Sequence, residues 1–268
     1  MNALHILLMV MLTATTSYSQ NPKKAETVSL NGTTIYYEVY GKGAPLLLLH
    51  GYTQSSASWL PFVSGYTDDF EVYLVDLKGH GKSGWFTEKL SIKSAALDLN
   101  SLITYLKLDL ISAIGYSYGG DILFQLALLN PELIQSMITV GSCGSWNAND
   151  FPGWLEYLSY KNVDQLPWMR QQHTDEEQIQ IILDQVPNYN IKLSDAELKS
   201  ISAKTMMVIG DKDDSLDWND LLNAKRILPN ASLWVVPDME HGAHRDQNKD
   251  NFIRVSREFL KSTPAQVK

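Results

Sequence analysis

The sequence predicts an α/β fold in which a mostly parallel central sheet is flanked by helices. Three observations support this class. Short apolar runs alternate with amphipathic helical patterns, an antiparallel hairpin precedes them, and a serine between glycines joins one strand directly to the next helix. Strands that alternate with helices pair in parallel and are covered on both faces. A length of 268 residues suits one domain with an insertion.

The expected elements follow in chain order. The hairpin pairs 26–30 with 33–40 around a turn at Asn31-Gly32, a dipeptide that favours tight hairpins. The later strands are short apolar runs, expected at 45–49, 70–75, 110–114, 134–140, 205–209 and 232–236. The helices have apolar residues at helical spacing, expected at 92–106, 122–129, 176–183, 195–201, 218–228 and 252–260.

Residues 145–200 interrupt the alternation with aromatic side chains among polar helical stretches. We expect them to form a small helical lid across the C-terminal edge of the sheet, where open α/β sheets bind ligands. The alternative is a packing decoration that makes no contact with a substrate.

The segment Gly115-Tyr116-Ser117-Tyr118-Gly119 is the most informative in the chain. Glycines two positions before and after a serine permit a very tight strand-to-helix turn, from which the hydroxyl projects. Gly120 would let the following helix pack close to the sheet. The pattern alone is weak, since an ordinary glycine-rich turn can hold an incidental serine. Its position between a β-like run and a helical pattern favours a nucleophile elbow.

Composition and charge limit the classes of binding partner to be expected. The formal net charge of −8 argues against nucleic acid or an anionic membrane, so a small-molecule substrate is the expected partner. No exposed apolar stripe or heptad pattern is apparent, so we expect a monomer. Cys143 is the only cysteine, which allows no intramolecular disulfide, and we expect it to be a small buried residue rather than a nucleophile.

The first 20 residues are typical of a signal peptide. Residues 4–12 are apolar, too few to span a bilayer, and small residues follow, so we expect cleavage near Ser19-Gln20. The mature domain would then be 21–268, secreted or periplasmic, without stable membrane insertion. A frayed or membrane-tethering N-terminus is the alternative.

Four motifs occur together along the chain. They are His50-Gly51, Asp76 followed by Gly79-His80-Gly81, the serine segment, and an acidic segment followed by histidines. In these motifs the chain resembles the α/β-hydrolase superfamily, typified by single-domain esterases and lactonases with a helical cap. The resemblance covers about residues 26–262. It implies a serine hydrolase with a catalytic triad, an oxyanion hole, no cofactor and no metal.

A serine hydroxyl needs a nearby base to act as a nucleophile, usually a histidine oriented by a carboxylate. The family's order is serine, acid, histidine, so both partners should follow Ser117. Residues 140–149 hold no carboxylate, whereas three aspartates follow the strand expected at 205–209. The resemblance implies that Asp213 is the acid, with Asp211 and Asp214 as alternatives.

Two histidines follow the acidic segment, His241 and His244. His241 lies between the last strand and the last helix, where the family places its catalytic histidine. His244 is the runner-up, and is otherwise expected to be a loop or surface residue. His50 and His80 precede the serine and are expected to brace loops. Neither the aspartates nor the histidines have the spacing and partners of a calcium or zinc site.

The resemblance also implies an oxyanion hole made by the backbone N–H groups of Tyr52 and Tyr118. The expected reaction is cleavage of a carboxylic ester or lactone through an acyl-enzyme on Ser117. Thioester, amide or carbon–carbon cleavage, acyl transfer, a slow-turnover ligand receptor and an inactive interaction protein are alternatives. An epoxide hydrolase or dehalogenase is disfavoured. In those members of the family an aspartate is expected at the position that Ser117 occupies in this chain. The expected substrate is small and fairly apolar, bound by aromatic lid residues, namely Trp146, Trp154 and Trp168.

Overall fold

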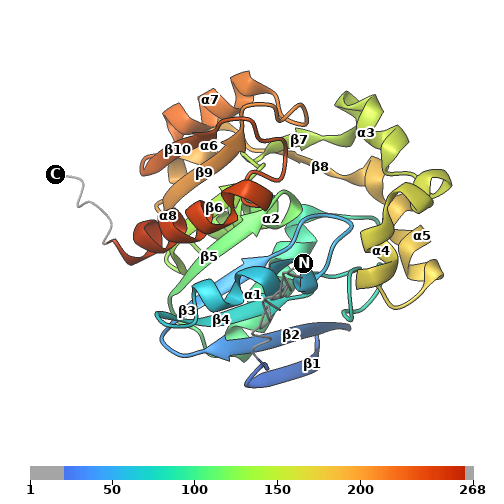
Figure 1. Cartoon of the computed structure of the whole chain (residues 1–268), viewed down its shortest axis with the longest axis horizontal. Coiled ribbons are helices and arrows are strands. Elements are labelled where there is room, and N and C mark those ends of the chain that lie inside the picture. The colour runs from blue at the N-terminus through green and yellow to red at the C-terminus, as the bar shows by residue number, and fades with distance from the viewer. Residues whose placement is uncertain (1–20, 263–268) are drawn as a thin grey trace, which may run out of the picture.

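The computed structural model describes residues 21–262, so the predicted signal peptide at 1–20 lies outside the described residues. An eight-stranded sheet forms the centre of the molecule, in the order β1-β2-β4-β3-β5-β6-β9-β10 (Figure 1). The strands are β1 (Lys24–Leu30), β2 (Thr33–Gly41), β3 (Ala44–Leu49), β4 (Phe70–Val75), β5 (Ile111–Tyr116), β6 (Ile134–Val140), β9 (Lys204–Gly210) and β10 (Ala231–Val236). Strand β2 pairs antiparallel with β1 and β4, and the other neighbours are parallel. The predicted fold class is confirmed.

The N-terminal hairpin forms as its turn sequence predicts. Leu30 pairs with Thr33, and between them Asn31 and Gly32 have φ values of 49° and 82°. Asparagine and glycine tolerate this left-handed backbone best, which is why they direct a two-residue turn.

Helical segments cover both faces of the sheet. One face carries α1 (Ile92–Tyr105), α2 (Tyr118–Leu129) and α7 (Trp218–Ile227), with α6 (Asp195–Ser200) against α7. The other carries a 3₁₀ segment, η1 (Ser56–Gly65), and α8 (Lys249–Lys261), which follows η5 (Asp246–Asn248). Side chains along a strand point to alternate faces, so Leu47 and Leu49 pack on the first face and Leu46 and Leu48 on the second. The sequence did not predict η1.

The predicted lid segment lies between β6 and β9. It contains β7 (Ser145–Asn147), η2 (Ala148–Asp150), α3 (Pro152–Tyr157), η3 (Tyr160–Gln165), α4 (Pro167–Gln172), α5 (Glu176–Asp184), η4 (Val186–Asn188) and β8 (Asn190–Lys192). Strands β7 and β8 pair antiparallel at the base of the segment, a small ladder that the sequence did not predict. Helices α3, α4 and α5 gather on one side of the molecule (Figure 1).

Hydrogen bonds fasten part of this segment to the rest of the domain. The fully buried Gln178 of α5 donates through Nε2 to the carbonyl oxygens of Gly79 and Gly81, at 3.1 and 2.9 Å. The Tyr52 hydroxyl donates to the carbonyl oxygen of Ile182, also in α5, at 2.7 Å. Helix α5 is therefore bonded to two loops of the domain. Within residues 21–262, no helix has the length and apolarity needed to cross a membrane.

A matched pair of leucine truncations tests the assignment of the core. Leu48 in β3 is 0% exposed, whereas Leu60 in η1 is 46% exposed. We expect Leu48→Ala to lower the free energy of unfolding by about 2–5 kcal/mol, because it leaves a cavity at the centre of the sheet. Leu60→Ala should cost less than about 0.5 kcal/mol. Urea unfolding of both variants measures this, and equal losses would contradict the assignment.

Candidate active site

Ser117 occupies a strained turn between β5 and α2. Its backbone has φ 48° and ψ −112°, values that cost a non-glycine residue on the order of 1–3 kcal/mol. The Ser117 N–H donates to the carbonyl oxygen of Val140 at the end of β6, at 2.7 Å. Helix α2 begins at the next residue, Tyr118, so the expected direct strand-to-helix turn is present.

The flanking glycines are required by close backbone contacts. A Cβ atom at Gly115 would lie 2.5 Å from the carbonyl carbon of Gly119. A Cβ at Gly119 would lie 2.5 Å from the carbonyl oxygen of Leu49, at the end of β3. Backbone atoms cannot move aside as a flexible side chain can, so only glycine fits at both positions.

His241 and Asp213 form a hydrogen-bonded pair in the loops that follow β10 and β9. The His241 Nδ1 lies 2.9 Å from Asp213 Oδ2, and the Asp213 side chain is fully buried. Burial alone would raise the pKa of this carboxyl group, but hydrogen bonds from His241 and Ser215 outweigh it and hold the pKa below its usual value. An ionised carboxylate only accepts, so His241 carries its proton on Nδ1 and leaves Nε2 free to act as a base. The alternatives Asp211 and Asp214 are exposed.

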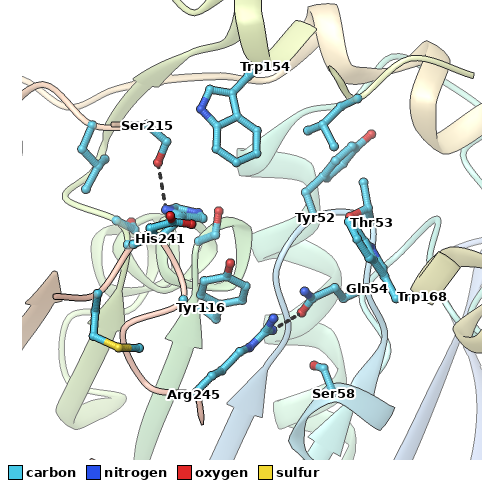
Figure 2. Close-up of a pocket in the computed structure, with 18 of the residues that line it drawn as sticks. Tyr52, Thr53, Gln54, Ser58, Tyr116, Trp154, Trp168, Ser215, His241 and Arg245 are labelled. Atoms are coloured by element: carbon cyan, nitrogen blue, oxygen red, sulfur yellow. Dashed lines mark hydrogen bonds between the residues drawn. The ribbon is translucent and has the colours of Figure 1, made fainter. Parts of the chain in front are cut away.

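Ser215 contacts both residues of this pair, and the sequence did not predict it. Its hydroxyl donates to Asp213 Oδ1 at 2.6 Å and lies 2.8 Å from His241 Nδ1 (Figure 2). Its backbone N–H also donates to Asp213 Oδ1, at 3.0 Å. The only available signal was a hydroxyl residue two positions after the predicted acid.

His244, the runner-up base, does not line the cavity described below and is only 1% exposed. It lies in the loop between β10 and α8, as one of the two expectations had it, but not at the surface. Its ring packs against the rings of Tyr116, Trp59 and Phe252, with centroids 4.7, 5.0 and 5.6 Å away. Burial holds its pKa well below the usual value, which favours a neutral ring.

His50 and His80 brace loops, as expected. His50 Nε2 accepts the backbone N–H of Leu77 at 3.0 Å, and His80 Nε2 accepts that of Thr53 at 3.3 Å. Burial lowers the pKa of His50 to about 4, consistent with a neutral acceptor. Cys143 is buried, and burial raises the pKa of its thiol to about 12, so it is held as an unreactive thiol.

A cavity of about 730 Å³ contains both Ser117 and His241 in its lining. The three predicted lid tryptophans also line it. Trp154 faces His241 with ring centroids 5.9 Å apart, Trp168 donates to the Thr53 hydroxyl at 3.2 Å, and Trp146 donates to a carbonyl oxygen at 2.9 Å. The remaining aromatic residues of the lining are Tyr52, Tyr116, Tyr157 and Tyr189. Figure 2 shows Trp154 on one side of His241 and Tyr116 on the other.

The predicted oxyanion donors lie on either side of the serine turn. A Cβ at Gly51 would lie 3.6 Å from the Ser117 Cβ, so the loop that carries Tyr52 packs against the serine. Among residues 21–262, neither the Tyr52 N–H nor the Tyr118 N–H has a hydrogen-bond acceptor. The Tyr118 side chain is fully buried and does not line the cavity.

A buried carboxylate at the wall of the cavity, Asp121, was also missed by the sequence analysis. Its oxygens accept hydrogen bonds from the hydroxyl groups of Ser142 and Tyr189, at 2.5 and 2.7 Å. Burial raises its pKa to about 6 despite these two bonds. The part of the chain that the structure describes holds no group of three or more His, Cys, Asp or Glu side chains suited to a metal ion.

Comparison with known proteins agrees with this architecture. The family profile described as alpha/beta hydrolase fold matches residues 44–172. The chain therefore has the α/β-hydrolase fold. A solved structure described as Est816, an N-acyl homoserine lactone degrading enzyme, shares this fold with a TM-score of 0.73. It is 24% identical, over 87% of this chain and 100% of that one.

Two curated proteins match over shorter segments. The soluble epoxide hydrolase of Corynebacterium sp. (strain C12) is 32% identical over 108 residues, which are 40% of this chain and 38% of that protein. The pimeloyl-[acyl-carrier protein] methyl ester esterase of Aeromonas hydrophila is 34% identical over 122 residues, 45% of this chain and 46% of that protein. The matched segments therefore span less than half the length of either relative.

The glycine contacts at the serine turn predict a contrast between two glycine-to-alanine variants. Gly119→Ala should lower the free energy of unfolding by about 1–3 kcal/mol, because the new methyl group meets the backbone of β3. Gly153→Ala in α3 meets nothing within 4 Å and should be neutral or stabilising by up to about 1 kcal/mol. Thermal or urea unfolding compares them. A neutral Gly119→Ala would contradict the close contact.

The raised pKa of Asp121 predicts a pH-dependent stability. Its pKa rises from 3.8 to about 6 on folding, so between these values the folded state binds the extra proton. The stabilisation is present below about pH 4 and is lost as pH rises through 6, by at most about 3 kcal/mol. In urea unfolding, wild type should therefore lose stability relative to Asp121→Asn between pH 4 and pH 6.5. Parallel profiles for the two proteins would show that burial does not raise this pKa.

Proposed function

We propose that the protein is a serine hydrolase that cleaves a carboxylic ester or lactone of a small, fairly apolar substrate. The observation that carries the proposal is the His241–Asp213 pair at 2.9 Å, whose histidine lines the same cavity as Ser117 at its strained turn. A histidine with a carboxylate on Nδ1 and a free Nε2 is the arrangement that activates a serine.

The proposed reaction begins when Ser117 Oγ attacks the ester carbonyl carbon and His241 Nε2 takes the hydroxyl proton. The negative charge that develops on the carbonyl oxygen is stabilised by the backbone N–H groups of Tyr52 and Tyr118. His241 returns the proton to the leaving alcohol oxygen, which leaves an acyl group on Ser117. Water, deprotonated by His241, then releases the acid. Asp213 stabilises the imidazolium at each step and stays ionised.

The cavity supports a small substrate with apolar parts. Its volume of about 730 Å³ is within the usual range for small-molecule sites, and Trp146, Trp154 and Trp168 line it. One relative is named a methyl ester esterase and one similar structure a lactone-degrading enzyme, which favours acyl chemistry. Another relative is named an epoxide hydrolase. A serine at the turn of this chain favours an acyl-enzyme over attack on an epoxide by a carboxylate.

Removal of the nucleophile tests the proposal first. Ser117→Ala should lower kcat/KM for short-chain p-nitrophenyl esters by at least about a thousandfold, the scale seen when a triad nucleophile is lost. A spectrophotometric assay of the released nitrophenolate measures it. Unchanged activity in this variant would exclude Ser117 as the nucleophile.

The three aspartates after β9 provide a matched comparison in the same assay. Asp213→Asn should lower kcat by about 10²- to 10⁴-fold, because the amide favours the wrong histidine tautomer. Asp211→Asn, at an exposed position, should leave kcat within about twofold of wild type. Equal losses in the two variants would overturn the assignment of Asp213.

A further inference from the structure

Arg245 is one of two cationic side chains that line the cavity, and the other, Lys212, is paired with Asp238. Arg245 lies in the loop between β10 and α8 that also carries His241, and it lines the same cavity. Its guanidinium carbon is 4.6 Å from the ring centroid of Tyr116, the residue directly before Ser117. Figure 2 shows Trp154 and Arg245 at opposite ends of the site, with His241 and Tyr116 between them.

The guanidinium is held in place without a carboxylate partner. Its NH2 group donates to Gln54 Oε1 at 2.7 Å, and Nε donates to His244 Nε2 at 3.2 Å. A guanidinium has five N–H donors and stays charged at all ordinary pH values. Three of the five have no acceptor among residues 21–262, and Arg245 forms no ion pair with any carboxylate in that range.

The acidic residues of the cavity do not neutralise this charge. Asp238 pairs with Lys212 at 2.9 Å, and Asp121 is bonded to two hydroxyls of the wall. Glu240 and Asp246 are exposed at the rim, and neither is within ion-pair distance of Arg245. Exposed rim charges are screened by water and salt, whereas a charge on the cavity wall acts at contact distance.

We propose that Arg245, oriented by Gln54 and Tyr116, binds a free carboxylate of the substrate, so that the preferred substrate is an ester or lactone with a second, ionised acid group. The inference rests on the proposed hydrolase function and deepens it. A planar guanidinium matches a carboxylate with two parallel hydrogen bonds, and its stacking on Tyr116 fixes the plane of the fork. The apolar body of the substrate would then lie toward Trp154, with the reacting carbonyl between the two ends.

Two esters that differ by one methyl group, and thereby in charge, test the proposal. Mono-4-nitrophenyl glutarate carries a free carboxylate, and 4-nitrophenyl methyl glutarate is its neutral counterpart. Arg245→Gln should raise KM for the anionic ester by about 10- to 100-fold, the loss expected for a charge-assisted contact. The neutral ester should change by less than about threefold. Arg245→Lys, which keeps the charge but loses the fork, should recover part of the preference.

A matched control makes the same chemical change elsewhere. Arg254 on α8 is exposed and pairs with Glu258 at 3.2 Å, so Arg254→Gln should leave both esters unaffected. Equal losses for the anionic and neutral esters in Arg245→Gln would assign Arg245 a purely structural role. Unchanged KM for both esters would also overturn the proposal.

Binding without turnover separates this proposal from the proposed reaction. Calorimetry of the two esters with Ser117→Ala, and with Ser117→Ala combined with Arg245→Gln, measures the charge preference alone. A preference for the anionic ester that disappears in the double variant supports the carboxylate site even if wild type hydrolyses neither ester. Equal binding of both esters to Ser117→Ala overturns it even if wild type hydrolyses them well.

Discussion

The close approach of the first turn of α2 to the ends of β3 and β5 is the constraint on which the rest of the site depends. Gly115 and Gly119 allow the two backbones to meet without intervening side chains. Ser117 is thereby forced into a left-handed conformation, and its side chain reaches the cavity instead of the helix surface. The same contact places the start of α2, with its unbonded N–H of Tyr118, beside the loop of Tyr52. Strain in one residue therefore organises both the nucleophile and its proposed oxyanion donors.

Two buried aspartates show how partners decide the charge state of a carboxyl group. Asp213 accepts hydrogen bonds from His241 and Ser215, and these lower its pKa despite burial. Hydrogen bonds to Asp121 from Ser142, Tyr189 and the Gly144 backbone also favour its ionised form, but burial outweighs them and its pKa rises to about 6. Burial opposes ionisation at both positions, and only at Asp213 do the hydrogen bonds outweigh it. The carboxylate that must stay ionised in the proposed reaction is the one beside the base.

Much of the fold could be predicted from local patterns. Apolar runs located all six later strands within a residue or two, and helical spacing located α1, α5 and α7 equally well. Segment η1 was missed because Pro61 and neighbouring serines disguise its apolar face. The β7–β8 ladder was missed because three-residue strands carry no periodicity of their own.

Only those site residues that belong to a recognisable sequence motif could be predicted. The glycine-flanked serine and the order of acid and histidine directed attention to Ser117, Asp213 and His241. Ser215 and Arg245 carry no motif, because their roles depend on loops that meet only in the folded chain. The burial of His244 was not predicted for the same reason, since the sequence of a loop does not say which way its side chains turn. Export and a monomeric state stay predictions.

The anchoring of the segment over the cavity is uneven, and this bears on how a ligand enters. Helix α5 is bonded through Gln178 and the Tyr52 hydroxyl to loops of the domain, so its displacement would break several buried bonds together. Helix α3 has no buried residue, yet it carries Trp154 above His241. A local displacement of α3 would therefore break fewer buried contacts than a displacement of α5. Displacing α3 would open the cavity beside Trp154 and His241, whereas α5 would stay bonded to the loops of the domain.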